Sequence, residues 1–241
     1  MMSVVVVTGG TRGLGIAIVQ RLSQEGYSVI ATGREKSSEL SALIDSNSDR
    51  VHFEAFDFND TSEIRQFARS ISTNYGRIYG LVNNAAIGRD GILATMHERQ
   101  ISELIRVNIE APALLTKYLL RPMLLNGRGR VINISSIIAT TGYTGLSVYG
   151  ATKAAIEGFT KSLAREVGRA GITVNTISPG FMQTEMTHSL NTSALEKIKR
   201  RSPLGRLVDV EDVAESVAFL MGPAADGITG STLTVDAGST A

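Results

Sequence analysis

The chain has 241 residues, 43% hydrophobic and 20% charged, which is typical of an ordinary globular protein. It contains no cysteine, which excludes disulfides, thiolate nucleophiles and cysteine-ligated metals. Its net charge of +1 gives no global field for a nucleic acid or an anionic membrane, so we expect neither as a partner.

The three histidines, His52, His97 and His188, are scattered without metal-ligand spacing, so no metal site is predicted. The apolar start of the chain lacks a basic lead and a cleavage site, which favours a buried strand over a signal peptide. No apolar run approaches the roughly 18 residues of a membrane span. We therefore expect a cytoplasmic protein.

Short runs rich in valine and isoleucine alternate with amphipathic stretches along the chain. The runs are almost entirely apolar, a pattern typical of parallel strands covered by helices on both faces. Strands are expected at 3–8, 28–32, 51–56, 78–83, 130–135, 171–178 and 231–235. Helices are expected near 13–25, 35–46, 60–75, 97–125, 147–169 and 210–221.

This alternation predicts right-handed βαβ crossovers and an α/β fold with a seven-stranded, doubly wound parallel sheet. No linker, low-complexity tract or internal repeat divides the chain, so residues 1–241 are expected to form a single domain. Residues 183–206 interrupt the alternation, and their length, polarity and position predict a lid over the ligand crevice.

A glycine-rich segment follows the first strand and opens the first helix. Its glycines permit a tight turn close to a pyrophosphate, and the helix N-terminus offers free N–H groups. A glycine cluster alone is often just a turn, but this strand–loop–helix context favours a Rossmann-type dinucleotide site. The spacing is one residue wider than the common G-x-G-x-x-G motif. The expected contacts are Gly9, Gly10, Thr11, Arg12, Gly13, Leu14 and Gly15.

The end of the second strand indicates which cofactor binds. An acidic residue there would bond the ribose 2′-hydroxyl of NAD, whereas arginine suits the 2′-phosphate of NADP. Arg34 stands at this point, and Arg12 could clamp the same phosphate. The sequence therefore favours NADP(H); the alternative is that both arginines are solvated surface groups.

Two further strand ends offer cofactor contacts. Asp57, followed by Phe58, could accept a hydrogen bond from the adenine amino group, or Asp57 could cap a helix beginning near Thr61. The small residues closing the fourth strand would let the backbone lie close to a flat ligand, or form a turn in which asparagine side chains bond local backbone. These residues are Asn84, Ala85 and Ala86.

Tyr149 and Lys153 stand four residues apart in an expected helix, which places them on one ridge. A partly desolvated cation beside the phenol would lower its pKa toward the working pH and favour proton exchange. Such a pair alone is commonly a solvated face. Ser136 ends the fifth strand, and Asn108 lies in the fourth helical region, where it could simply interrupt a helix before Pro112.

Together these motifs resemble the short-chain dehydrogenase/reductase family across nearly the whole chain. The matching set is Thr8–Gly15, Asn83–Ala86, Asn108, Ser136, Tyr149, Lys153 and Pro179-Gly180. The resemblance implies hydride transfer to a carbonyl, with Tyr149 donating the proton and Ser136 holding the carbonyl oxygen. It also implies that Lys153 holds the nicotinamide ribose and lowers the Tyr149 pKa. Asn108 would anchor a water that replaces the proton.

By the same resemblance, the loop after the sixth strand contacts the nicotinamide carboxamide. The implied contacts are Pro179, Gly180, Met182 and Thr184. The carboxyl ends of strands at a switch point are where ligands bind in such sheets, which makes an ordinary proline turn the weaker interpretation.

Within the family, four stretches look like 3-oxoacyl-acyl-carrier-protein reductases: 162–166, 171–175, 179–186 and 203–206. This implies NADPH-dependent reduction of a 3-oxoacyl thioester to its (R)-3-hydroxyacyl form, in fatty-acid or specialised acyl biosynthesis. The alternatives are an alcohol, sugar or small-ketone dehydrogenase and, more remotely, a non-catalytic nucleotide-binding protein, which would need no proton donor.

An acidic acyl carrier protein would need a basic surface near the site. The candidates are Arg128, Arg130 and Arg169, and the lid run Lys197, Lys199, Arg200 and Arg201. A basic run of this kind is often simply solvated. The resemblance further implies a homotetramer or homodimer, built through helices 97–125 and 147–169. Ala237, where the family often has glycine, is expected to alter only a subunit contact.

Overall fold

Seven parallel strands form one sheet in the order β3-β2-β1-β4-β5-β6-β7, as the sequence predicted. The structure is a computed structural model that describes residues 3–182 and 192–241. The strands are β1 (Val4–Thr8), β2 (Ser28–Gly33), β3 (Val51–Ala55), β4 (Ile78–Asn83), β5 (Gly129–Ile134), β6 (Ile172–Pro179) and β7 (Thr232–Val235). The strand order reverses between β1 and β4, which creates the switch point where such sheets bind ligands.

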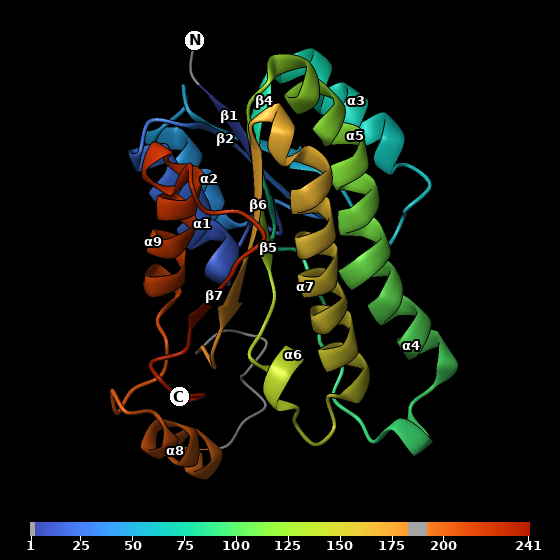
Figure 1. Ribbon diagram of the computed structural model, residues 1–241, viewed down its shortest axis with the longest axis vertical. Coiled ribbons are helices and arrows are strands. Elements are labelled where there is room, and N and C mark those ends of the chain that lie inside the picture. The colour runs from blue at the N-terminus through green and yellow to red at the C-terminus, as the bar shows by residue number, and fades with distance from the viewer. Residues whose placement is uncertain (1–2, 183–191) are drawn as a thin grey trace.

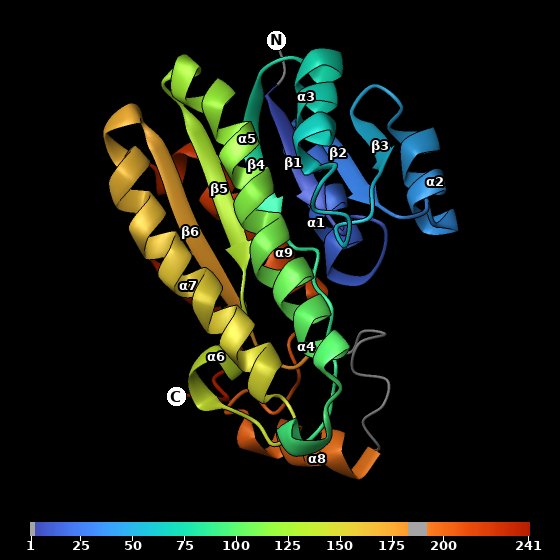
Figure 2. The same cartoon turned by 90° about the vertical axis from the view of Figure 1, so that its right-hand side faces the viewer.

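Helices cover both faces of this sheet (Figure 1). One layer holds α1 (Gly13–Gln24) and α9 (Val210–Met221), and the other holds α3 (Ile64–Tyr75), α5 (Ala111–Asn126) and α7 (Ser147–Val167). α2 (Ser38–Ser46) lies beside β3 at the sheet edge (Figure 2).

Strand β1 shows how the sequence builds two hydrophobic cores. Val5 and Val7 join the cluster beneath α1 and α9, while Val4 and Val6 join the cluster beneath α3, α5 and α7. Successive side chains of a strand point to opposite faces, so an apolar run without alternation fills both cores.

The predicted helix at 97–125 is divided. α4 (Glu98–Ile105) leads into a π-helical turn, η2 (Arg106–Glu110), before α5 begins. Three further elements lie outside the predicted helix ranges: η1 (Leu93–Thr95), α6 (Ile138–Thr141) and α8 (Thr192–Arg201). Two 3₁₀ turns, η3 (Gly168–Ala170) and η5 (Pro223–Ala225), complete the helical elements of the described chain.

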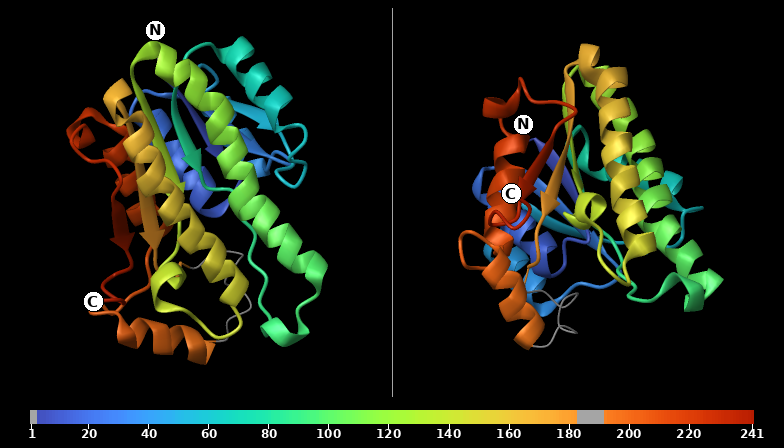
Figure 3. Two further views of the ribbon diagram at one scale, coloured as in Figure 1. Left: turned by 45° about the vertical axis from the view of Figure 1, so that its right-hand side comes forward. Right: turned by 60° about the horizontal axis from the view of Figure 1, so that its bottom comes forward.

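The carboxyl ends of the strands, α6 and α8 lie at the same end of the molecule (Figure 3). The predicted lid falls partly outside the described residues, because 183–191 are not among them, and its described part contains α8. Within the described part of the chain, no helix has the length and apolar character needed to cross a membrane.

Candidate active site

The glycine loop between β1 and α1 is shaped by close backbone contacts. Gly9 has a φ of +63°, a conformation that favours glycine, and a Cβ on Gly15 would lie 1.9 Å from the Gly9 carbonyl oxygen. Asn84 Nδ2 donates to the carbonyls of Thr8 at 2.9 Å and Gly9 at 3.2 Å, holding the loop against the end of β4. The Asn84 side chain thus bonds the backbone at the end of β1 rather than that of its own turn.

The start of α1 fits an anionic group. The side chain of its N-cap residue, Arg12, makes no capping hydrogen bond. No capping side chain therefore competes with an anion for the N–H groups of the first turn. No side chain heavier than hydrogen fits at Gly15 without moving the backbone, because the start of α1 packs directly on the Gly9 carbonyl and on Asn84.

The end of β2 lies against the same loop. Ser37 Oγ donates to the Thr11 carbonyl at 2.6 Å, and a Cβ on Gly33 would lie 2.8 Å from Thr11 Cγ2. Arg12 and Arg34 are both exposed at this shared edge. Their placement suits a phosphate held between the loop and β2.

The structure distinguishes between the two interpretations of Asp57, as an adenine contact or as a helix cap. Its Oδ1 accepts from the Asn59 N–H at 2.9 Å, and α3 begins at Ile64 with Glu63 as its N-cap. The helix-capping alternative is therefore wrong, because Asp57 caps a turn well before the helix. The adenine contact stays a prediction.

Phe58 is buried, and its ring lies edge-on to Phe56 with centroids 5.0 Å apart. The ring of Phe58 therefore belongs to the core, and its expected cofactor contact would have to come from its backbone.

Ser136, Tyr149 and Lys153 come together where β5 ends against α7. Helical spacing predicted the ridge of Tyr149 and Lys153, and the family resemblance implied that Ser136 lies beside it. Lys153 is buried, and its Nζ donates to the Ile134 carbonyl at 2.9 Å while lying 5.6 Å from the centroid of the Tyr149 ring. Burial raises the pKa of Tyr149 to about 12, and a hydrogen bond with Ser136 opposes that rise.

Burial also lowers the pKa of Lys153 to about 8. The expectation that Lys153 would lower the Tyr149 pKa is therefore wrong for the chain by itself. The physical reason is that burial desolvates both groups and so favours the neutral form of each.

Asn108 sits in the η2 turn with its side chain fully engaged. Its Oδ1 accepts from the Ile87 N–H at 2.9 Å, and its Nδ2 donates to the Ile87 carbonyl at 2.9 Å and to Thr152 Oγ1 at 3.1 Å. Pro112, four residues on, has no N–H to complete an α-helical bond to the Asn108 carbonyl, and the turn here is π-helical, with the Ala111 N–H donating to the Arg106 carbonyl. The water that Asn108 was expected to anchor stays a prediction.

Thr152 was missed from the sequence. Its hydroxyl accepts from Asn108 and donates to the Tyr149 carbonyl at 2.7 Å, which links the η2 turn to the helix that carries the tyrosine. The available signal was its position three residues after Tyr149, on the buried side of α7.

The loop after β6 lies between the ends of β5 and β7. The Pro179 carbonyl accepts from the Ile137 N–H at 3.0 Å, and the Gly180 N–H donates to Val235 at 2.9 Å. A Cβ on Gly180 would lie 2.8 Å from the Asp236 Cα, so only glycine fits without a shift. Met182 pairs with Val208 in an isolated bridge, whereas Thr184 lies outside the described residues.

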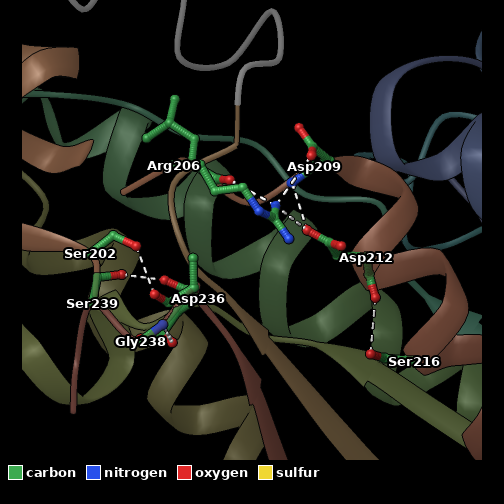
Figure 4. Close-up of polar contacts among 10 residues, drawn as sticks. Ser202, Arg206, Asp209, Asp212, Ser216, Asp236, Gly238 and Ser239 are labelled. Carbon is green, nitrogen blue, oxygen red and sulfur yellow. Dashed lines mark hydrogen bonds and ion pairs between the residues drawn. The ribbon is translucent and has the colours of Figure 1, made fainter. Parts of the chain in front are cut away.

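The segment after α8 is held by hydrogen bonds to the C-terminal tail and to the start of α9. Ser202 Oγ donates to the Ala237 carbonyl at 2.6 Å, and Arg206 bonds Asp212 at 2.5 Å and Asp209 at 3.2 Å (Figure 4). A hollow of about 480 Å³ lies beside Arg206 and Asp236. Its lining comes from Leu204 and Arg206 before α9, from α9 and β7, and from the tail, not from the elements that carry the catalytic candidates.

The chain is similar to known proteins over almost its whole length. Residues 9–240 match the family model described as enoyl-(acyl carrier protein) reductase. The chain is 40% identical over 235 residues to the 3-oxoacyl-[acyl-carrier-protein] reductase FabG of Vibrio cholerae, covering 98% of this chain and 96% of that protein. It is 37% identical over 237 residues to FabG of Escherichia coli K12, with coverage of 98% and 96%.

Solved structures agree with this similarity. A variant of actinorhodin polyketide ketoreductase with NADPH superposes with a TM-score of 0.91 at 31% identity, covering 99% of this chain and 97% of that one. A gluconate 5-dehydrogenase from Burkholderia cenocepacia, in complex with NADP and tartrate, gives a TM-score of 0.93 at 28% identity, with coverage of 99% and 95%.

Proposed function

Because the chain belongs to the short-chain dehydrogenase/reductase family, we propose that it reduces 3-oxoacyl thioesters with NADPH. The product is the (R)-3-hydroxyacyl thioester, formed on an acyl carrier protein in fatty-acid or specialised acyl biosynthesis. The observation that carries the proposal is the meeting of Ser136, Tyr149 and Lys153 at the β5–α7 contact, in a chain 40% identical to a 3-oxoacyl-[acyl-carrier-protein] reductase.

The roles of the residues follow from their surroundings. NADPH supplies the hydride that reduces the carbonyl carbon. With a pKa of about 12, Tyr149 keeps its proton at neutral pH and can donate it to the carbonyl oxygen. Ser136 hydrogen-bonds the same oxygen as its charge grows. Lys153 lies close enough to the ring to stabilise the phenolate that forms when Tyr149 gives up its proton.

The cofactor site is built from the loop and the strand ends beside it. The tight packing of Gly9 and Gly15 supports pyrophosphate binding at the start of α1, and exposed Arg12 and Arg34 support a 2′-phosphate. The loop from Pro179 to Met182 would hold the nicotinamide end. The contacts of Asp57, Ala86 and Thr184 remain predictions.

An acyl carrier protein is the proposed macromolecular partner. Arg130 is removed from the candidate docking residues, because it is 2% exposed and ion-paired with Asp226. Arg128 and Arg169 are exposed and precede β5 and β6, at the end of the sheet opposite the catalytic residues. The second exposed basic surface is α8, with Lys197, Arg200 and Arg201, at the catalytic end.

Two charge-reversed variants test that partner. One carries Arg128→Glu and Arg169→Glu, and the other Arg200→Glu and Arg201→Glu. We expect one of them to raise the KM for a carrier-linked substrate while leaving the KM for the matching coenzyme A thioester unchanged. Unchanged KM values in both variants would argue against carrier-protein docking on either surface.

We also propose that the chain forms a homotetramer, or at least a homodimer. The outer side of α7 presents small exposed residues, including Ala151, Ala155 and Gly158, which would let another helix pack closely. Phe219 on α9 and Leu233 on β7 are large exposed apolar residues on the other side. Analytical ultracentrifugation distinguishes these assemblies from a monomer. A cytoplasmic location stays a prediction.

The substrate proposal is tested by following NADPH oxidation with an acetoacetyl thioester, simple ketones and sugars in parallel. We expect the thioester to give the highest kcat/KM. A second candidate is a sugar or small-ketone dehydrogenase, favoured by the 0.93 TM-score to a gluconate 5-dehydrogenase. Turnover of ketones or sugars without turnover of the thioester would establish that candidate instead.

A further inference from the structure

Glu157 continues the ridge of α7 that carries Tyr149 and Lys153. The three residues are spaced four apart, so their side chains lie one above another on the same side of the helix. Their partners are all at the end of β5. Tyr149 bonds Ser136, Lys153 Nζ bonds the Ile134 carbonyl, and Glu157 Oε1 accepts from Ser135 Oγ at 2.9 Å.

Ser135 contacts α7 at two points one turn apart. Besides Glu157, its hydroxyl lies 3.2 Å from the Lys153 carbonyl oxygen. The hydroxyl has one proton, and the shorter contact, to a carboxylate, is the charge-assisted one. Ser135 is buried and Glu157 is partly buried, so solvent competes weakly for this bond.

The strand side of this contact is also fixed. The Ser135 N–H donates to Ile177 at 2.8 Å, and the Ile137 N–H donates to Pro179 at 3.0 Å. Ser136 lies between these two anchors, so its backbone is held to β6 on both sides. The Ser135 side chain then ties the same strand end to α7.

Catalysis requires Ser136 and Tyr149 to contact the same carbonyl oxygen, but Ser136 follows β5 whereas Tyr149 lies on α7. Their relative position depends on how β5 and α7 register against each other. A displacement of about 1 Å at a reacting centre can cost about a hundredfold in rate. The bond between Ser135 and Glu157 joins β5 to α7 within one residue of Ser136 and one turn of Lys153.

We propose that Ser135 and Glu157 are positioning residues that hold the proton donor on α7 in register with Ser136 on β5. This inference rests on the proposed reduction. It assigns a function to a serine and a glutamate that are not among the residues proposed to contact the substrate or the cofactor.

The test is a double-mutant cycle on kcat. Ser135→Ala and Glu157→Leu should each lower kcat about tenfold, and the double variant should be no slower than either, because both remove one bond. Glu157→Gln retains an acceptor oxygen and should recover most of the rate. Glu166→Leu, an exposed glutamate on the same helix, is the matched control and should retain wild-type kcat.

Two readouts separate positioning from simple stability. The NADPH dissociation constant should stay within about twofold of wild type, because the glycine loop is untouched. Rates are expressed per folded subunit, counted by NADPH titration. Lower melting temperatures with unchanged kcat per folded subunit would overturn the inference, as would strictly multiplicative losses in the double variant. Ser135→Ala removes one oxygen and decides the matter if Glu157→Leu does not fold.

The cycle is measured with an acetoacetyl thioester and with a simple β-ketoester. Wild-type enzyme that reduces only the ketoester refutes the proposed substrate, and the variants are then compared on the ketoester. Wild-type enzyme that reduces the thioester alongside equally active variants refutes the positioning role alone.

Discussion

The ammonium of Lys153 lies 5.6 Å from the centre of the Tyr149 ring, but its hydrogen bond goes to the carbonyl of Ile134. The lysine is therefore anchored to β5, and the tyrosine beside it stays protonated with a pKa of about 12. This arrangement stores a proton on Tyr149 and places a positive charge near the phenolate that forms when the proton leaves.

The first prediction concerns the pH dependence of activity. The Lys153 pKa of about 8 means that the side chain loses its charge as pH rises through that value. With less positive charge beside Tyr149 and the cofactor site, kcat/KM for NADPH should fall above pH about 8, because this parameter reports the free enzyme. A Lys153→Arg variant that stays active should not show the fall. A wild-type profile that is flat across this range would contradict the assignment.

A second prediction concerns stability. The Lys153 pKa is lowered from 10.5 to about 8 on folding, so between these values the unfolded chain binds more protons than the folded one. Stability should therefore gain from this group as pH rises from about 8 toward 10.5, and the gain is absent at lower pH. Urea unfolding of wild type and Lys153→Met across this range measures it. The variant should lack the part of the pH dependence due to Lys153; identical curves would show that Lys153 titrates normally.

Arg34 should determine the preference for NADPH over NADH. Arg34→Asp replaces a phosphate-binding cation with a group that accepts from the ribose hydroxyl, so the kcat/KM ratio should shift toward NADH by at least about tenfold. Arg69→Asp, an exposed arginine on α3, makes the same charge change away from β2 and should leave the ratio unchanged. An equal shift in both variants would indicate a general charge effect.

Ala237 is the one residue other than glycine with a positive φ in the described chain, at +54°. This backbone conformation strains alanine by about 1 kcal/mol or more in the folded state. Glycine avoids that strain, but its larger conformational entropy in the unfolded chain offsets part of the gain. Ala237→Gly should therefore raise the free energy of unfolding by about 0.5 kcal/mol. A β-branched residue at the same position should lower it. Urea denaturation of Ala237→Gly and Ala237→Val tests this, and a loss of stability in the glycine variant would contradict it.

Much of this architecture could be predicted from local pattern. The apolar runs identified all seven strands to within one residue at each end, since burial on both faces leaves a clear composition. The ridge of Tyr149 and Lys153 followed from helical spacing, and the glycine loop from its position after β1. The expected alteration near Ala237 was a subunit contact; the structure shows a backbone conformation that strains alanine.

Other features depend on tertiary contacts that a linear pattern does not contain. The π-helical turn lies where Asn108 bonds Ile87, and no residue near Asn108 in the sequence indicates that Ile87 is its partner. The raised pKa of Tyr149 comes from burial, which the helical spacing does not report. Arg130 looked like a surface cation, but the strand beneath α9 places it inside, against Tyr79 and Asp226.

The proton-donor role of Tyr149 is tested most directly by the Tyr149→Phe variant, which removes one oxygen and keeps the ring. NADPH oxidation with an acetoacetyl thioester should fall to background, while the NADPH dissociation constant should stay within about twofold of wild type. Turnover of the variant at the wild-type rate would contradict the assignment of Tyr149 as the proton donor.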